Sequence, residues 1–318
     1  MKKEFWGRNM GFIRDQIEDL KEILDRKFFS YDGVEKCMLK ISEHYFVLTE
    51  QAEDMNKEQV FEFVELGSMV VSHDLLDSEA FRKLCDENLM IVGLIDLCGR
   101  ACDIVSEWET SVKIRPKTAE LFLKHGKESF AANSLEFTGI AFYNLGDLEK
   151  AIKYRVESGG LAEKLQHYKS AGFSYDGVGQ YYSEIGDLDS AIKYKEIAYD
   201  CFMVAAENLI QDMRHMLIRA TKSLRTGADF AKAKKDYEKI ADFLLKTEKP
   251  LLRLDRAREA AKNIDEAADY LYLQGKIEKA LEQKQRALEL YLQTGRKFKK
   301  FNIETQIEYL KTKLPKPL

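Results

Sequence analysis

The chain repeats itself at an offset of 40 residues, and this repetition limits the fold more than any other feature of the sequence. The segment GIAFYNLGDLEKAIKYRVES begins at Gly139, and GQYYSEIGDLDSAIKYKEIA begins at Gly179. Self-similarity at a fixed period of this size is typical of stacked helical repeats. Further matched pairs are Gly146 with Gly186, Asp147 with Asp187, Ala151 with Ala191 and Tyr154 with Tyr194.

Each copy predicts two helices joined by a tight turn. Apolar residues recur three and four positions apart on either side of a Gly-Asp pair. Gly146 can adopt the positive φ that ends a helix, and Asp147 can cap the next helix with its carboxylate. Ala151 is small where the two helices would approach most closely. Gly139 lies within a helix, where glycine costs about 1 kcal/mol relative to alanine. The same residue type at Gly179 indicates close helix contact there, with two incidental glycines as the alternative.

This pattern resembles the tetratricopeptide repeat family. In that family a small residue in the first helix is followed by an aromatic residue, a turn glycine, an alanine and another small residue. A fourth, weaker copy of the pattern has Gly227 and Ala233, with one extra residue after the glycine. The three clearer copies are Gly179, Tyr182, Gly186, Ala191 and Ala198; Gly139, Phe142, Gly146, Ala151 and Ser158; and Ala268, Leu271, Gly275, Ala280 and Ala287.

The spacing of the copies is similar to that of long-repeat members of the family. Ala151, Ala191, Ala233 and Ala280 are 40, 42 and 47 residues apart, whereas the usual period is about 34 residues. Kinesin light chains, the soluble attachment proteins of membrane fusion and bacterial Rap-type regulators have such long repeats. The resemblance covers residues 117–309. It implies an all-α fold whose helical hairpins stack as a right-handed superhelix, or α-solenoid, but it does not identify a partner, because such repeats serve many.

The resemblance also implies a concave groove lined by outward-facing residues of each first helix. Aromatic rings would give contact area there, and Asn and Gln would bond an extended peptide backbone. The tyrosines could instead pack between neighbouring repeats. Binding of a peptide's terminal carboxylate is not expected, because the Lys and Asn that some members use are replaced by Asn133 and Phe137. The implied groove residues are Asn133, Phe137, Ile140, Tyr143 and Asn144; Phe173, Asp176, Gln180, Ser183 and Glu184; and Asp265, Asp269 and Tyr272.

Composition supports a helical chain in a reducing compartment. Only four prolines occur, and no Val/Ile/Thr-rich alternating run predicts a strand. No apolar run approaches the roughly 18 residues that would span a bilayer, and the N-terminal residues lack a signal-peptide core. Five cysteines are an odd number without a disulfide framework. We therefore expect a cytoplasmic protein.

The N-terminal third predicts helices without a clear repeat. We expect an acidic helical region, either a bundle or degenerate repeats, over residues 1–115, divided at Arg115–Pro116 from a repeat array over residues 116–318. The hexapeptide FSYDGV occurs at Phe29–Val34 and Phe173–Val178, so repeats could begin near residue 30, or the match could be chance. Expected helices outside the copies are Asn9–Lys27, Val34–Ala52, Lys57–Ser72, a fourth capped by Asp77 or Ser78 and running towards Trp108, one opened by Pro250, and a final capping helix at Phe298–Lys313.

No motif in the sequence predicts catalysis or cofactor binding. The chain lacks GxxxxGK[ST], HExxH and GxSxG, and has no GxGxxG after a strand. Cys98 and Cys102 are one helical turn apart, but a zinc site needs about four ligands, so we interpret both as buried core cysteines. The five histidines are scattered. The sequence predicts no enzyme, no cofactor and no metal.

Charge is unevenly distributed along the chain. Residues 1–120 carry 16 Lys and Arg against 25 Asp and Glu, while residues 121–318 carry 34 against 29. The overall net charge of −4 gives no reason to expect nucleic acid. A basic C-terminal cluster could contact anionic lipid or an acidic partner, or could be a solvated helix face. Its members are Arg296, Lys297, Lys299, Lys300, Lys311, Lys313 and Lys316.

These observations predict a non-enzymatic scaffold or adaptor that binds a protein or peptide in its groove. Two alternatives stay open. One is a regulatory sensor whose acidic N-terminal region closes on the basic repeats until a ligand or partner opens it. The other is a membrane-trafficking adaptor resembling the soluble attachment proteins and using the basic C-terminus. Homo-oligomers are compatible with all three.

Overall fold

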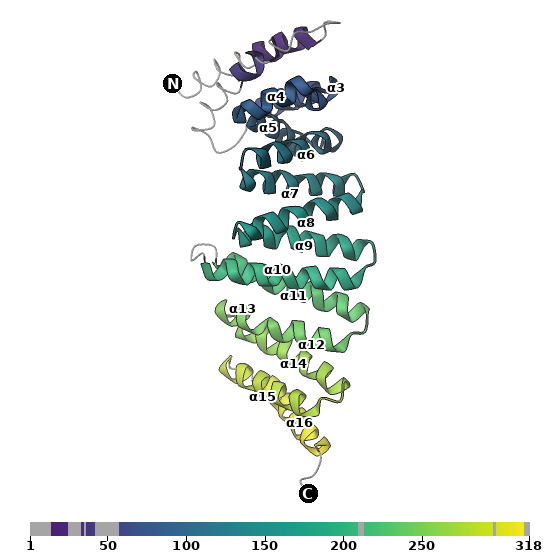
Figure 1. Ribbon diagram of the computed structural model, residues 1–318. Coiled ribbons are helices and arrows are strands. Elements are labelled where there is room, and N and C mark those ends of the chain that lie inside the picture. Colours follow the sequence, from purple (N-terminus) through teal and green to yellow (C-terminus); the bar gives the residue numbers. More distant parts are fainter. Residues whose placement is uncertain are drawn as a thin grey trace, which may run out of the picture. The chain divides into compact units, whose positions relative to one another are not determined.

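The computed structural model describes residues 14–24, 33–34, 36–41, 57–208, 213–294 and 297–314. Within these ranges the regular structure is entirely helical, and the order of elements is shown in Figure 1. The chain forms two compact units, residues 1–161 and 162–318. The predicted all-α fold of stacked helical hairpins is confirmed within each unit.

The first unit is built on one continuous apolar core. Residues 14–24 and 36–41 are helical and bury Ile17, Leu20 and Met38 in the same core as the later helices. The ends of the first two expected helices, and the first copy of FSYDGV up to residue 32, lie outside the described residues. The later elements are α3 (Lys57–Ser72), the 3₁₀ turn η1 (Leu75–Asp77), α4 (Glu79–Glu87), α5 (Leu89–Val105), α6 (Trp108–Lys124), α7 (Glu128–Asn144) and the greater part of α8 (Leu148–Lys164).

The second unit continues the alternation of helices. Its elements are α9 (Tyr168–Glu184), α10 (Leu188–Asn208), α11 (Met213–Ala233), α12 (Tyr237–Lys246), α13 (Glu248–Arg253), α14 (Ala257–Leu273), α15 (Ile277–Gln293) and α16 (Lys297–Lys313). The predicted final helix is confirmed by α16. The expected helix from Pro250 to Ala268 is wrong, because the chain turns at Leu254–Arg256 and divides it into α13 and α14.

Two expectations for the first unit need correction. The fourth helix starts as predicted, with the Ser78 side chain accepting from the Phe81 N–H at 3.4 Å. It does not run on to Trp108, since Asn88 has extended backbone angles and separates α4 from α5. No helix begins at Arg115–Pro116 either, because α6 passes through Pro116. The division into residues 1–115 and 116–318 stays a prediction about folding units, and the two compact units divide elsewhere.

Left-handed residues mark the turns at a regular interval. They occur at Ser106, Gly126, Gly146, Gln166 and Gly186, which are 20 residues apart, and again at Lys235, Asp255 and Gly275. One helix and its turn therefore occupy 20 residues, and a hairpin occupies 40. The interval from Gly186 to Lys235 is 49 residues, because α10 and α11 have 21 residues each where α9 has 17, and the linker between them is one residue longer than that between α8 and α9.

The predicted hairpin closures are confirmed in three of the four copies. Ala151, Ala191 and Ala280 are fully buried. A Cβ added to Gly139 would lie 3.0 Å from the Ala151 carbonyl oxygen, and one added to Gly179 would lie 3.1 Å from that of Ala191. The matched glycines therefore permit close approach of the paired helices, as the sequence indicated.

The fourth copy was placed in the wrong register. Gly227 lies inside α11 rather than at a turn, and Ala233 is the exposed last residue of that helix. The turn is made by Lys235 at a φ of 59°, followed by Asp236 as the N-cap of α12. The buried position four residues after the cap is therefore Ile240. The other copies have glycine at the equivalent turn, and the sequence pattern therefore matched Gly227 wrongly to that position.

Glycine at position 235 should stabilise the chain. Lysine in the left-handed region carries steric strain of roughly 1 kcal/mol that glycine avoids, partly offset by glycine's greater freedom when unfolded. We expect Lys235→Gly to raise the free energy of unfolding by about 0.5 kcal/mol, measured by urea denaturation. Gly275→Ala, at the equivalent turn, should lower it. A loss of stability in Lys235→Gly would show that the Lys235 side chain contributes more than the turn strain.

Candidate binding surface

A buried ion pair recurs between the two helices of each regular hairpin. A cation on the second helix pairs with a carboxylate 19 residues earlier, on the first helix. The pairs are Arg115–Asp96 at 3.2 Å, Arg155–Glu136 at 3.9 Å, Lys195–Asp176 at 2.8 Å and Lys284–Asp265 at 2.6 Å. We call these the hairpin ion pairs. All four cations are buried, so each pair is strongly coupled to the packing of its hairpin.

The small residues of the first helices make room for these cations. A Cβ on Gly99 would lie 3.1 Å from Cγ of Arg115, and one on Gly139 would lie 2.6 Å from Cγ of Arg155. The methylene stems of Arg115 and Arg155 thus cross the first helix where no side chain blocks them. These glycines therefore let the two helix backbones approach closely and also leave room for the side chain of the cation.

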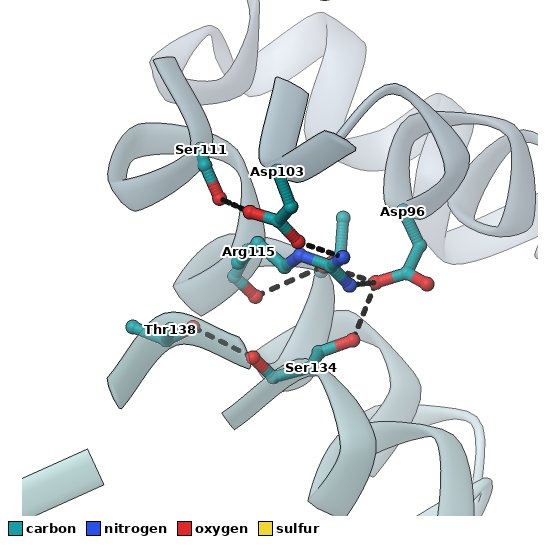
Figure 2. Close-up of polar contacts among 7 residues, drawn as sticks. Asp96, Asp103, Ser111, Arg115, Ser134 and Thr138 are labelled. Carbon is teal, nitrogen blue, oxygen red and sulfur yellow. Dashed lines mark hydrogen bonds and ion pairs between the residues drawn. The ribbon is translucent and has the colours of Figure 1, made fainter. Parts of the chain in front are cut away.

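The most extensive of the pairs is the Arg115 cluster, in which Arg115 lies between two carboxylates (Figure 2). Its guanidinium donates to Asp96 on one side and to Asp103 on the other. Ser111 donates to Asp103 at 2.6 Å, and Ser134 of α7 donates to Asp96. Burial raises the pKa of Asp103, although the nearby Arg115 opposes this. The cluster fastens α5, α6 and α7 to one another, and we interpret it as structural.

Three of the predicted groove carboxylates belong to this framework. Asp176 accepts from Lys195 at 2.8 Å and from Ser223 of α11 at 2.7 Å. Asp265 and Asp269 both contact the Lys284 ammonium at 2.6 Å. Each already has a buried lysine as its ion-pair partner, so these carboxylates are poorly placed to bind a cationic ligand.

None of the predicted groove residues is buried, and each unit presents its own set. In the first unit the set lies on α7, where Phe137 is 39% exposed and stacks under the Arg115 guanidinium at 4.7 Å. In the second unit Phe173 contacts Phe202 and the Arg219 guanidinium, and Gln180 donates to Glu184 at 3.2 Å. The exposed members are Asn133, Phe137, Asn144, Gln180, Glu184 and Asp269, and the half-buried members are Ile140, Tyr143, Phe173, Asp176, Ser183, Asp265 and Tyr272.

Successive first helices of the second unit contact each other through polar side chains. Ser223 of α11 bonds Asp176 of α9, and Arg225 of α11 donates to Asn263 of α14 at 3.0 Å. Tyr272 of α14 lies within 3.3 Å of the Tyr309 hydroxyl on α16. Their outward residues therefore form one surface, which we call the first-helix surface. Tyr272 contacts the C-terminal helix α16, and its part in a groove stays a prediction.

The sequence did not predict the residues that α11 contributes to the first-helix surface. In the register that the structure shows, Ala228 of α11 is equivalent to Gly139 of α7 and Gly179 of α9. The missed outward residues are Lys222, Arg225, Thr226, Asp229 and Lys232. Two features of the sequence predict this register. One is an Asp N-cap eight residues after the small residue, as at Asp147 and Asp187. The other is a serine five residues before the small residue, as at Ser134 and Ser174.

The cysteines are buried in the described core, as expected. Burial raises the pKa of Cys85, Cys102 and Cys201 to about 12 and that of Cys98 well above its ordinary value, so none is poised to form a thiolate. Across the residues that the structure describes, no group of three or more potential metal ligands is found. The described helices include none long and apolar enough to cross a membrane.

The basic C-terminal cluster is only partly described. Lys311 pairs with Glu308 at 2.7 Å, and the Lys313 ammonium lies 5.1 Å from the Tyr309 ring. Arg296 and Lys316 lie outside the described residues. Its contact with a membrane stays a prediction.

The repeated geometry decides the fold assignment. Paired antiparallel helices close on a small residue, turn at a left-handed residue and stack first helix upon first helix. The fold is tetratricopeptide-like. No protein-family model matches the chain, and no curated protein matches it.

Several solved structures are similar to this chain at low identity. BtubC (BKLC) from P. vanneervenii is 14% identical over 76% of this chain and 92% of its own, with a TM-score of 0.41. A putative kinesin light chain from Podosopora anserina is 14% identical over 64% of this chain and 95% of its own, with a TM-score of 0.38. A Rap protein complexed with competence and sporulation factor is 11% identical over 98% of this chain and 99% of its own, with a TM-score of 0.38.

Proposed function

We propose that this chain is a non-enzymatic scaffold or adaptor that binds a protein or peptide on the first-helix surfaces of its repeats. The observation that carries the proposal is the direct contact between successive first helices in the second unit. Because Ser223 reaches Asp176 and Arg225 reaches Asn263, outward side chains from several helices form one surface. A long surface of this kind suits an extended peptide or a partner helix.

The chemistry of the surface supports binding rather than catalysis. The acidic groups nearest its interior, such as Asp176 and Asp265, are held by buried lysines. A general acid or base must instead reach a substrate proton. The exposed groups of the first helices include an aromatic ring and amides, such as Phe137, Asn133 and Gln180, which give contact area and hydrogen bonds to a peptide backbone.

The test is loss of partner binding when outward residues are shortened. We expect Tyr143→Ala combined with Gln180→Ala to weaken binding of the native partner by about tenfold, a typical loss when two interface contacts are removed. Partners would be captured from the native host, identified by mass spectrometry and titrated in purified form. Lys153→Ala combined with Lys193→Ala, at matched exposed positions on second helices, is the control. Unchanged affinity in the first-helix variant for every captured partner would contradict the proposal.

A further inference from the structure

The first-helix surface of the second unit carries a group of cations that no carboxylate neutralises. On α11 these are Arg214, Arg219, Lys222 and Arg225, and on α14 they are Arg258 and Lys262. Within the part of the chain that the structure describes, none of the six forms an ion pair; Arg219 stacks on Phe173 and Arg225 donates to the Asn263 amide. We call this group the cation strip. All but Arg219 are exposed.

The carboxylates of the same two helices are, by contrast, all paired. Asp229 and Glu266 contact Lys232 at 3.7 and 2.7 Å. Asp265 and Asp269 share Lys284, and Glu259 accepts from Arg256 at 2.8 Å. The strip therefore has excess positive charge that the fold does not use, on a chain whose net charge is −4.

The strip follows the helices in a regular way. Arg219, Lys222 and Arg225 are three residues apart and so lie along one side of α11. Lys222 and Lys262 occupy the same repeat position, six residues before Ala228 and Ala268 respectively. The bond from Arg225 to Asn263, the neighbour of Lys262, brings the two helices together at this level.

A surface pocket adjoins the strip at the start of α14. Its volume is about 510 Å³, and its lining includes the cations Arg256, Arg258 and Lys262, the carboxylates Asp255 and Glu259, and Tyr291 and Thr294. Phe173 lies at the other end of the strip, beneath Arg219 at 4.9 Å. The surface thus offers cations flanked by an aromatic ring at one end and a pocket at the other.

We infer that the cation strip binds an acidic peptide segment of the partner. This inference rests on the proposed function and specifies the chemistry of its ligand. Glutamate or aspartate side chains would pair with Lys222, Arg225 and Lys262, and exposed cations gain from such complementarity mainly in association rate and specificity. An extended chain advances about 3.3 Å per residue, so its acidic residues can be spaced to meet cations on both α11 and α14.

A peptide fits this surface better than a nucleic acid does. The exposed Asp229 and Asp269 lie one helical turn beyond Arg225 and Asp265 on the same helices. A continuous phosphate backbone would bring its charges near these carboxylates, whereas a peptide can place neutral residues opposite them.

The test uses the full chain and a short fluorescent peptide with glutamate at every third position. We expect Lys222→Glu combined with Lys262→Glu to raise its Kd by about tenfold or more, and salt to weaken binding to the unaltered chain. Lys193→Glu combined with Lys279→Glu, on exposed positions of α10 and α15, gives the same net charge and should change Kd by about twofold at most. Circular dichroism would establish that both variants are folded.

Each other outcome overturns the inference. No binding by the unaltered chain, equal binding of a peptide with glutamine in place of glutamate, or equal losses in both variants would contradict it. Tighter binding of a single-stranded oligonucleotide would assign the strip to nucleic acid. If the native partner is lost from the Tyr143→Ala, Gln180→Ala variant but kept by Lys222→Glu, Lys262→Glu, the proposed function stands and the acidic ligand is wrong.

Discussion

Replacing Arg115 with leucine is expected to lower the free energy of unfolding of the first unit by about 3–5 kcal/mol, the usual result of removing one partner from a buried ion pair. Arg115 is 1% exposed and is the only cation in its cluster with Asp96 and Asp103 among the described residues. Without it, two largely buried carboxylates have only Ser111, Thr118 and Ser134 as hydrogen-bond donors.

The loss should depend on pH in a defined direction. Burial already raises the pKa of Asp103, and Arg115 is the largest influence lowering it, so the pKa rises further in the variant. A carboxyl whose folded pKa exceeds its unfolded pKa destabilises the fold above the folded pKa. That penalty disappears as pH falls and the group is protonated. The deficit of Arg115→Leu should therefore be smaller near pH 5 than near pH 8.

Hydrogen exchange of amides in α5, α6 and α7 in the full chain measures this deficit locally. Arg82→Leu is the matched control. Arg82 is about half exposed and pairs with the exposed Asp77 at 3.1 Å, so its loss should be within about 1 kcal/mol. Two results would contradict this prediction: an equal loss of stability in the two variants, or a loss in Arg115→Leu that does not change with pH. Either result would show that the cluster does not stabilise the first unit by pairing buried charges.

Local signals in the sequence predicted most of the fold. Gly146, Gly186 and Gly275 are left-handed as expected, because only glycine adopts that geometry without strain. The bounds of Lys57–Ser72 are those of α3. The errors occurred where tertiary packing overrode a local preference. Lys235 turns without glycine because the hairpin imposes the turn, and α6 accommodates Pro116 in its interior.

The sequence predicted less about which charges on the first-helix surface are paired. Outward positions follow from helical periodicity, so none of the predicted groove residues is buried. Which charges are neutralised depends on contacts between helices, and Asp176 cannot be seen to meet Lys195 from either segment alone. One signal was present nonetheless: Asp96, Glu136, Asp176 and Asp265 each precede a Lys or Arg by 19 residues. The cation strip was missed because the fourth copy was aligned on Gly227.

Replacing Gly139 with leucine should destabilise the first unit by about 3 kcal/mol, at the upper end of ordinary overpacking effects. A Cβ there would lie 2.6 Å from Cγ of Arg155 and 3.0 Å from the Ala151 carbonyl oxygen. The Arg155 stem could shift, but the carbonyl belongs to the backbone of α8 and can move only if the hairpin opens. Opening it would also separate Arg155 from Glu136, whose pKa burial already raises.

Gly93 provides the matched control, because a Cβ added to it meets nothing within 4 Å. It lies in α5 of the same unit, so Gly93→Ala should gain helix propensity, about 0.5–1 kcal/mol of stability, without a clash. Urea denaturation of the full chain would compare the two variants, with unequal slopes reporting a change in the surface exposed on unfolding. If Gly139→Leu were as stable as the unaltered chain, the repeated glycines would be incidental, and the hairpin ion pairs would not need them to reach their carboxylates.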